Sequence, residues 1–459
     1  MRFRQHARDR RLKMTQNTPP RGSGRPKNPS ASRQGGRRPK QGQERRPAPD
    51  PTRDLAFDIV CGVVEHRRML ETTLDRAGPM DLRDRASAHR LAATTLRYLG
   101  SMTEILQPML RREPPEPVRC ALLLGVAQLL HLETPPHAAV GTIVDLLRRR
   151  GLAPFAGLAN AVLRRVAREG RDLMEGLDEA RLDVQPWMWG AWGQRARSIS
   201  RGLHREAPLD LSLRPGATAP EGGDVLPTGT VRYPAGTRIA TMEGFEEGQF
   251  WAQDVAAAMP VKLMGSVSGK TVIDLCAAPG GKTAQLATAG AQVIAIEKEE
   301  ARAVRLRENI ARMRVEAETI VADGLTWRPK APVDAVLLDA PCSATGTFRR
   351  HPDVLWIKRP RDVTALAQGQ DAFIDSAREM LKPGGMLMYA VCSLQDEEGP
   401  DRIRAALERG GWRHEPFTDA ELAEMSIART PEGFFRTHPG LWWDRGRMDG
   451  FFAARLIKV

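Results

Sequence analysis

Apolar side chains recur every three to four residues through the first third of the chain, from Thr52 to about Gly170. This spacing predicts amphipathic helices that each turn one face toward a core. The stretch from Val118 to Leu132 is apolar on nearly every side, so we expect it to be a buried central helix. Pro114-Pro115 interrupts the pattern ahead of it. Residues 51–170 are therefore predicted to form an all-α domain of about six helices.

From about Gly244 the pattern changes to short apolar runs that alternate with helical stretches. The runs that we expect to be strands are Thr271–Leu275, Gln292–Glu297, Glu318–Ala322, Val333–Leu338 and Met386–Val391. Such continuous runs are typical of parallel strands buried on both faces. A helix from Arg361 to Leu381 is expected to end on a left-handed glycine in Lys382-Pro383-Gly384-Gly385. Residues 244–459 are therefore predicted to be a doubly wound, Rossmann-like α/β domain that binds ligands beyond the carboxyl ends of its strands.

The segment between these regions, residues 171–243, follows neither pattern. Leu209–Leu213 alternates in the manner of a short strand, and proline and glycine dominate up to about Gly236. We interpret the segment as a small linker subdomain. Its tryptophans are expected to pack between domains rather than to stack on bases; they are Trp187, Trp189 and Trp192.

The positive charge of the chain is concentrated at its N-terminus. Residues 1–50 hold 15 Lys+Arg against 3 Asp+Glu, out of a net charge of +13 for the whole sequence. This tail has few large apolar residues, so it cannot bury a core and is predicted to be disordered. It is either an electrostatic arm for nucleic acid or a solvated extension, part of which is absent if translation starts at Met14.

Composition also narrows the class of protein. No apolar run is long enough to span a bilayer, and the basic N-terminus lacks the apolar core of a signal peptide, so we expect a cytoplasmic protein. The five cysteines are scattered and suit reduced thiols. Cys61 and Cys120 lie in apolar helices and are expected to pack as small hydrophobic side chains. No Cys/His cluster has the spacing of zinc ligands, so no metal is expected.

The strongest local motif runs from Asp274 to Thr283, where a buried strand gives way to small residues, two glycines and a helix. Small residues let the backbone approach a ligand closely, and the first N–H groups of a helix can hold an anion. A phosphate-binding P-loop is disfavoured, because Cys276 occupies the position at which that motif needs its first glycine. Glu297 ends the next strand, where an acid typically binds the ribose of an adenosine cofactor.

Two further motifs each place a cysteine just beyond a buried strand. One is Asp339-Ala340-Pro341-Cys342-Ser343, and the other is Tyr389-Ala390-Val391-Cys392-Ser393. Thiols at neighbouring strand ends suit a redox pair, a metal pair, or a nucleophile with a helper. The spacing alone does not choose among these alternatives.

Together these motifs resemble the RsmB/Sun-type RNA cytosine-5 methyltransferase family, whose bacterial members carry a NusB-like helical domain. The resemblance covers about residues 52–459. It implies an S-adenosylmethionine-dependent enzyme in which Cys392 attacks the cytosine ring and Cys342 helps to release the product. Asp339 would hydrogen-bond the ring nitrogen, and Lys282 would favour a thiolate or hold Asp339. The sequence departs from the family at Glu297, where aspartate is common, and at Val391, where threonine is usual.

The resemblance also implies contacts with cofactor and RNA. The predicted cofactor-binding residues are Cys276, Ala277, Ala278, Pro279, Gly280, Gly281, Lys282, Glu297, Asp323 and Asp339. Arg349, Arg350 and His351 are expected to meet RNA phosphate. Small-subunit ribosomal RNA is favoured over transfer RNA as the substrate, and a monomer is expected. A non-catalytic RNA-binding scaffold and a dithiol oxidoreductase are the alternatives from other classes.

Overall fold

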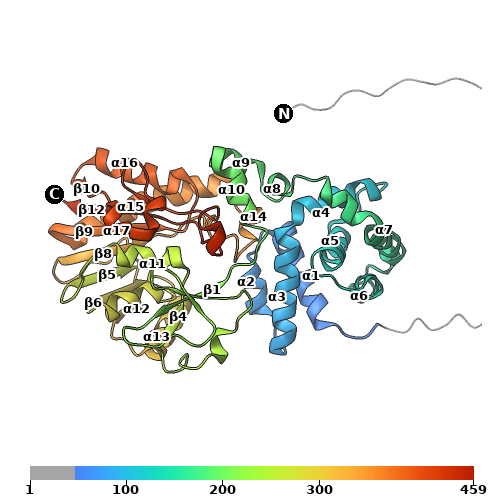
Figure 1. Cartoon of the computed structure of the whole chain (residues 1–459), viewed down its shortest axis with the longest axis horizontal. Coiled ribbons are helices and arrows are strands. Elements are labelled where there is room, and N and C mark those ends of the chain that lie inside the picture. The colour runs from blue at the N-terminus through green and yellow to red at the C-terminus, as the bar shows by residue number, and fades with distance from the viewer. Residues whose placement is uncertain (1–46) are drawn as a thin grey trace, which may run out of the picture. The chain divides into compact units, whose positions relative to one another are not determined.

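The helical region begins at Pro51, and the computed structural model describes residues 47–459 of the chain, so nearly all of the basic tail predicted at 1–50 lies outside the described residues. The helices of this region are α1 (Pro51–His66), α2 (Leu70–Arg76), α3 (Leu82–Arg97), α4 (Leu99–Leu106), α5 (Glu116–Leu130), α6 (Pro136–Arg149) and α7 (Ala156–Glu175) (Figure 1). Asp50 caps α1 by accepting a hydrogen bond from the Arg53 amide. The all-α prediction is confirmed, although α2 is too short to have produced a repeating pattern.

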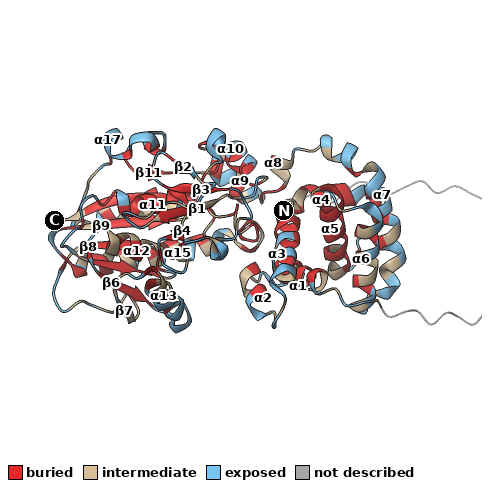
Figure 2. Cartoon of the chain, turned by 60° about the horizontal axis from the view of Figure 1, so that its bottom comes forward, coloured by how far each residue is buried: buried red, intermediate tan, exposed pale blue. Residues whose placement is uncertain are grey.

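Helix α5 is the centre of this region, as its uniform apolar pattern predicted. Most of its residues are buried, whereas α6 and α7 bury one face and expose the other (Figure 2). A Cβ atom at Gly125 would lie 2.6 Å from Leu163 Cδ1, so glycine at this position lets α5 and α7 approach closely. Burial of each leucine of α5 stabilises the domain by about 1.5–3 kcal/mol relative to an exposed side chain.

The linker subdomain contains short helices and an antiparallel sheet. The helices are α8 (Glu179–Leu182), α9 (Pro186–Trp192) and α10 (Ala196–Arg201). The strands are β1 (Leu209–Leu213), β2 (Asp224–Val225), β3 (Val231–Tyr233) and β4 (Phe250–Ala252), in the order β2-β3-β1-β4. Strand β4 pairs with β1, so the predicted domain boundary at Gly244 falls inside this subdomain. The ring of Trp192 lies 5.8 Å from that of Phe348 in the α/β region, which is the packing role expected for it.

The α/β region that follows, residues 253–459, is built on a mixed sheet. Its strands are β5 (Thr271–Leu275), β6 (Gln292–Glu297), β7 (Glu318–Val321), β8 (Val333–Asp339), β9 (Leu381–Val391), β10 (Trp412–His414), β11 (Phe435–Arg436) and β12 (Phe452–Lys458). Within the described residues the order is β10-β12-β9-β8-β5-β6-β7, with β11 paired to β12. Strands β5 to β9 pair in parallel, and β10 to β12 are antiparallel additions. The Rossmann-like prediction is confirmed for the parallel part.

Helices flank this sheet between its strands (Figure 1). They are α11 (Val255–Lys262), α12 (Gly281–Thr288), α13 (Glu300–Met313), α14 (Val354–Ile357), α15 (Pro360–Met380), α16 (Pro400–Arg409) and α17 (Asp419–Leu422). No helix among residues 47–459 is both long and apolar enough to cross a membrane.

The junction between α15 and β9 differs from the prediction. Helix α15 ends at Met380, and Leu381 already has an extended backbone and pairs with Val333. The register of β9 against β8 then shifts, with the next printed pair at Ala335 and Met386. The left-handed Gly384 (φ 74°) therefore lies in this irregular pairing and does not cap the helix.

The strand order determines where the chemistry lies. Strand β8 runs between β5 and β9, and all three are parallel. Their carboxyl ends therefore meet at one edge of the sheet. The three motifs found in the sequence directly follow or overlap these ends, so the fold brings them together.

Candidate active site

Two thiols meet at the carboxyl ends of β8 and β9. The Sγ atoms of Cys342 and Cys392 lie 3.5 Å apart, and both residues are half-buried. The Gly346 amide donates to the Cys392 carbonyl (3.0 Å), which ties the two cysteine loops together. The same loop also passes close to Gly450. A Cβ atom at Gly346 would lie 2.0 Å from the Gly450 carbonyl oxygen, so only glycine lets the Cys342 loop approach Gly450 this closely. The structure thus brings together the two cysteines that the sequence singled out.

The electrostatic environment separates the roles of the two sulfurs. The pKa of Cys342 is held well above its ordinary value, first by its contact with the Cys392 sulfur and then by burial. The raised pKa keeps the proton on the Cys342 thiol, which is able to donate to the Cys392 sulfur across this contact. A sulfur that accepts such a hydrogen bond suits a thiolate nucleophile.

Lys282 and Asp339 form an ion pair beside the thiols. Lys282 Nζ lies 2.7 Å from Asp339 Oδ2 and 4.9 Å from the centre of the Phe451 ring. The Lys282 side chain is only 11% exposed. Burial lowers the pKa of Lys282, but the Asp339 carboxylate raises it further, so the net shift is upward and the lysine stays charged. The cation orients the carboxylate toward the site.

The glycine-rich turn after β5 forms one wall of a cavity of about 190 Å³. Gly280 begins α12 with φ 106°, and a Cβ atom there would lie 2.9 Å from Leu306 Cδ1, so glycine is required. The cavity is lined by Ala252, Gln253, Ala257, Asp274, Cys276, Ala277, Ala278, Pro279, Gly281, Lys282 and Asp339. Most of the predicted cofactor-binding residues therefore surround one space that reaches the Lys282–Asp339 pair.

The predicted cofactor acids Glu297 and Asp323 do not line this cavity. Glu297 is 2% exposed, and its Oε2 has no hydrogen-bond partner among the described residues. Arg302 Nη1 lies 3.6 Å from that oxygen, which still has room to accept a hydrogen bond from a ligand hydroxyl, so the site can hold an adenosine cofactor. Asp323 is already engaged, because Lys298 Nζ lies 2.8 Å from Oδ2 and the Leu325 amide donates to Oδ1.

Asp274 received no role from the sequence, yet it lies against the cavity. It is 1% exposed and accepts a hydrogen bond from Thr283 Oγ1 (2.6 Å). Burial raises the pKa of the Asp274 carboxyl to about 7, despite that hydrogen bond and the nearby charge of Lys282. An acid within an apolar strand was the available signal, because such a residue is buried and has to be neutral or compensated.

We expect the substitution Asp274→Asn to change how stability depends on pH. The native Asp274 carboxyl retains its proton to about pH 7, whereas the unfolded chain releases it near pH 4. The wild-type protein therefore loses stability as pH rises between these values, and the amide variant loses less. The melting temperature of the ligand-free variant minus that of the wild type should therefore increase from pH 5 to pH 8. The control is Asp444→Asn at an exposed position; a constant difference across this range would contradict the expectation.

Arg349 and Arg350, which were predicted to contact RNA phosphate, both form ion pairs within the protein. The Arg349 side chain is fully buried, 3.6 Å from Asp449 Oδ1, and donates to the Gly446 carbonyl. Arg350 pairs with Asp254 and with Asp449, each at 2.9 Å. Arg349 is enclosed and Arg350 is 28% exposed, so their contact with RNA phosphate stays a prediction. Their acidic partners lie about a hundred residues away along the chain, where local reading of the sequence could not find them.

The loop that follows Cys342 is also fastened to the helical region. Arg97 donates to the Arg349 carbonyl (2.8 Å), and the Leu70 amide donates to Asp353 Oδ2 (2.9 Å). Trp356 Nε1 donates to the Leu96 carbonyl (2.7 Å). The helical region therefore supports the segment that carries one of the thiols. His351 is half-buried within this loop, and its predicted contact with phosphate stays a prediction.

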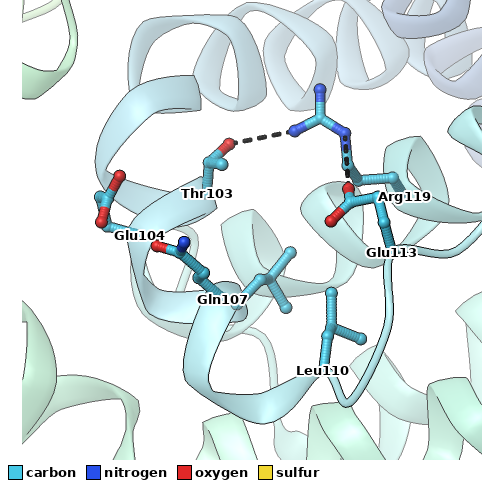
Figure 3. A pocket seen from close by; sticks show the side chains of 7 residues that line it. Thr103, Glu104, Gln107, Leu110, Glu113 and Arg119 are labelled. Atoms are coloured by element: carbon cyan, nitrogen blue, oxygen red, sulfur yellow. Dashed lines mark hydrogen bonds and ion pairs between the residues drawn. The ribbon is translucent and has the colours of Figure 1, made fainter. Parts of the chain in front are cut away.

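Two features of the helical region lie apart from this site. A hollow between α4 and the start of α5 is crossed by Arg119, which donates to Thr103 Oγ1 (3.3 Å) and pairs with Glu113 (3.8 Å) (Figure 3). These polar groups satisfy one another, and no predicted site residue lines the hollow. Within residues 47–459, Cys61, Glu65 and Cys120 form a group whose potential ligand atoms lie within 4.8 Å of one another. Cys120 is fully buried, as expected, whereas Cys61 is half-buried.

Comparison with known proteins agrees with this arrangement. Residues 261–457 match the family model described as 16S rRNA methyltransferase RsmB/F, and residues 50–168 match that of the NusB family. The chain is 33% identical over 434 residues to Ribosomal RNA small subunit methyltransferase B of Cronobacter sakazakii, covering 88% of this chain and 98% of that protein. It is 34% identical over 445 residues, with the same coverage, to the protein of that name from Yersinia pseudotuberculosis.

The chain belongs to the RsmB/F methyltransferase family. As a member of this family it is an S-adenosylmethionine-dependent RNA methyltransferase with an N-terminal NusB domain, as the motifs predicted. A solved structure described as the crystal structure of PH0851 supports the fold, with a TM-score of 0.67 at 21% identity over 90% of this chain and 99% of that chain.

One residue that supports the thiols was passed over in the sequence. Glu398 follows β9 within an acidic stretch, where it looks like a surface residue, yet it is fully buried. Its partners are the serines that come after the two cysteines. A serine after each cysteine was the only local signal for this arrangement.

Proposed function

We propose that this protein transfers a methyl group from S-adenosylmethionine to carbon 5 of a cytosine in small-subunit ribosomal RNA. One observation carries the proposal. The half-buried Cys392 sulfur lies 3.5 Å from a second thiol. Beside the thiols, a half-buried Lys–Asp pair borders a cavity built from the glycine-rich turn. Such a site supplies a nucleophile, a proton donor to its sulfur and an oriented carboxylate.

In the proposed reaction the Cys392 thiolate adds to carbon 6 of the ring and forms a carbon–sulfur bond. The electron pair that moves to carbon 5 makes that atom enamine-like and nucleophilic. The bound cofactor supplies the methyl group as an electrophile. Asp339, held by Lys282, hydrogen-bonds the ring nitrogen and shares a proton with it as charge develops. Water then takes the proton from carbon 5, the electron pair of that C–H bond restores the 5,6 double bond, and the carbon–sulfur bond breaks to return the Cys392 thiolate. Cys342 assists by donating a hydrogen bond to the departing sulfur, 3.5 Å away.

Ribosomal RNA is the favoured substrate because the relatives named as small-subunit ribosomal RNA methyltransferases align over 98% of their length. A transfer RNA substrate is the alternative, and ribosomal RNA as the substrate implies a cytoplasmic protein. A non-catalytic scaffold is disfavoured by the convergence of Asp339, Cys342 and Cys392. The test is bisulfite sequencing of total RNA from a strain that lacks the gene, beside methyl transfer by purified protein to transcribed small-subunit RNA. Loss of one cytosine signal in the ribosomal RNA is expected, and an unchanged map would contradict the proposal.

We expect the substitution Cys342→Ala to accumulate a covalent complex of enzyme and RNA. Without the second thiol the Cys392 bond still forms, but release of the methylated base slows. A gel under denaturing conditions should show a slow-migrating, RNase-sensitive band that the wild-type protein lacks at steady state. The same variant carrying Cys392→Ala is the control and should give no band. A band that persists in the double variant would place the nucleophile elsewhere.

An exposed basic cluster beside the catalytic region is a better candidate for phosphate contacts than Arg349 and Arg350. Arg201 and Arg205 are exposed, and neither forms an ion pair with any residue in the described range. They lie near Arg447, whose pKa is lowered first by burial and then by the positive charges of Arg349, Arg205 and Arg201. Positive charges that repel one another in this way are stabilised by an anion, so we propose that this cluster meets the RNA backbone.

We expect the double substitution Arg201→Gln/Arg205→Gln to raise KM for RNA several-fold and to leave kcat unchanged. Each lost phosphate contact should also reduce the slope of log KM against log salt concentration by about 0.7–0.9. The matched control is Arg404→Gln/Arg413→Gln, because both of these side chains are more than half exposed and lie in α16 and β10. Equal salt slopes for the two double variants would contradict the assignment.

A further inference from the structure

A carboxylate lies buried behind the two thiols. Glu398 is 0% exposed and ends the short helical turn Asp396–Glu398 between β9 and α16. No lysine, arginine or histidine of the described residues forms an ion pair with it. Burying a carboxylate without a cation carries a large desolvation penalty unless hydrogen bonds satisfy its oxygens. Its hydrogen-bond partners therefore indicate what this residue does.

The two oxygens of Glu398 bind the residues that directly follow the two cysteines. Oε1 accepts from the Ser343 amide (2.7 Å) and from Gln370 Nε2 (3.3 Å). Oε2 accepts from the hydroxyls of Ser343 and Ser393, each at 2.5 Å. Ser343 comes after Cys342, and Ser393 comes after Cys392. One carboxylate thus bridges the two loops at the position next to each thiol.

Hydrogen bonds from two other elements hold Glu398 in place, and a further bond joins the two loops around it. Tyr389, on β9, donates its hydroxyl to the Glu398 carbonyl (2.6 Å). Gln370, on α15, also donates to the Pro341 carbonyl (2.9 Å), immediately before Cys342. Thr345 Oγ1 accepts from the Leu394 amide (3.0 Å), which adds a second bond between the loops. Together these hydrogen bonds hold the two loops in a single arrangement.

We propose that Glu398 is a positioning residue that sets the separation of the Cys342 and Cys392 sulfurs by holding Ser343 and Ser393. The inference rests on the proposed function, in which both sulfurs serve the same cytosine ring. Cys392 has to reach carbon 6 while Cys342 acts on the same adduct, so their spacing is fixed by the size of the base. A displacement of about 1 Å in such an arrangement lowers the rate by on the order of 10²-fold.

The test compares Glu398→Gln with Glu397→Gln, an exposed neighbour in the same turn. The amide keeps the shape of the carboxylate but replaces one acceptor by a donor that faces other donors. We expect kcat for Glu398→Gln to fall on the order of 10²-fold, with KM for RNA and the dissociation constant for S-adenosylmethionine unchanged within about twofold. Glu397→Gln should match the wild type. Ser393→Ala, which removes one of the bridging hydroxyls, should give a smaller loss of kcat.

A second measurement follows the sulfur geometry without any methyl transfer. The diazene oxidant diamide takes one hydrogen from each of two thiols and leaves a disulfide, and two sulfurs held 3.5 Å apart need little movement to form that bond. The rate at which the full-length protein gains the Cys342–Cys392 disulfide, followed by mass spectrometry of its peptides, should fall at least tenfold in Glu398→Gln and not in Glu397→Gln.

The outcomes separate this inference from the proposed function. Wild-type rates of both cross-linking and catalysis in Glu398→Gln would overturn the positioning role. A loss of kcat accompanied by weaker cofactor binding and a lower melting temperature would also overturn it, because a general structural role predicts that result. If the wild-type protein methylates no cytosine, the proposed function fails, while the cross-linking comparison still decides whether Glu398 sets the sulfur spacing. If Glu398→Gln does not fold, Ser393→Ala takes its place in both measurements.

Discussion

Replacement of Cys392 by alanine should reduce methyl transfer by at least on the order of 10³-fold, since no other group in the site can form the bond to carbon 6. We do not expect Cys342 to take over this role, because burial still raises the pKa of its thiol after the Cys392 sulfur, the larger cause of the shift, is removed. The cofactor cavity is formed by other residues. We therefore expect Cys392→Ala to bind S-adenosylmethionine as the wild type does.

The measurement is incorporation of labelled methyl groups into small-subunit RNA, with equilibrium binding of S-adenosylmethionine in parallel. Cys61→Ala is a suitable control, because Cys61 lies on α1 in the helical region, away from the site, and should leave activity unchanged. Loss of cofactor binding together with activity would mean that the substitution damaged the fold. Activity within tenfold of wild type would remove Cys392 from the mechanism.

Much of this site could be predicted because its signals are local. A buried parallel strand is a run of apolar residues, and the residues directly beyond it lie at the carboxyl edge of the sheet. Asp339, Cys342 and Cys392 all follow this rule, and the strand order β9-β8-β5 then places them together. In the same way, the small residues before Gly280 directly after a buried strand predicted the turn that binds the cofactor. Family resemblance added the roles, which local pattern alone had left open between redox, metal and nucleophilic chemistry.

The parts that sequence reasoning missed depend on contacts between distant segments. In the sequence Glu398 looks like a surface acid because it is the third of three consecutive acidic residues. Its neighbours Asp396 and Glu397 are indeed exposed. Only the folded chain brings the hydroxyls of Ser343 and Ser393 to it. Residues 250–252 fell within the predicted catalytic region because the pattern changes at Gly244, and their pairing with β1, about 40 residues earlier, could not be read from the sequence. In each case the residue types were visible, but the partner that gives them a role was not.

The paired arginines Arg349 and Arg350 show how a local pattern can hide long-range partners. Two adjacent cations in a loop beside an active site suggested phosphate binding. In the structure both arginines pair with Asp449, and Arg350 also pairs with Asp254. These two carboxylates are 3% and 8% exposed. Asp254 also caps α11, and its Oδ1 accepts from the Asp449 amide. The cluster therefore joins the start of the catalytic region to the segment that precedes β12.

Removal of one charge from this cluster should destabilise the protein strongly. The substitution Asp449→Asn leaves Arg349 without its carboxylate partner and Arg350 with only Asp254. Breaking a buried ion pair from one side leaves an uncompensated charge, which costs about 3–5 kcal/mol. That is a large share of the 5–15 kcal/mol by which a folded domain is typically stable. We expect the unfolding transition of the catalytic region to move to markedly lower denaturant concentration, as followed by tryptophan fluorescence.

The matched control is Glu432→Gln, which breaks the pair between Arg404 and Glu432. Those side chains are 51% and 45% exposed, and exposed pairs typically contribute about 0–1 kcal/mol. The difference between the two variants isolates the effect of burial, because each removes one carboxylate from an arginine. A loss of less than about 1 kcal/mol in Asp449→Asn would mean that water reaches the cluster. The guanidinium groups of Arg349 and Arg350 would then become available to phosphate again, as the sequence had suggested.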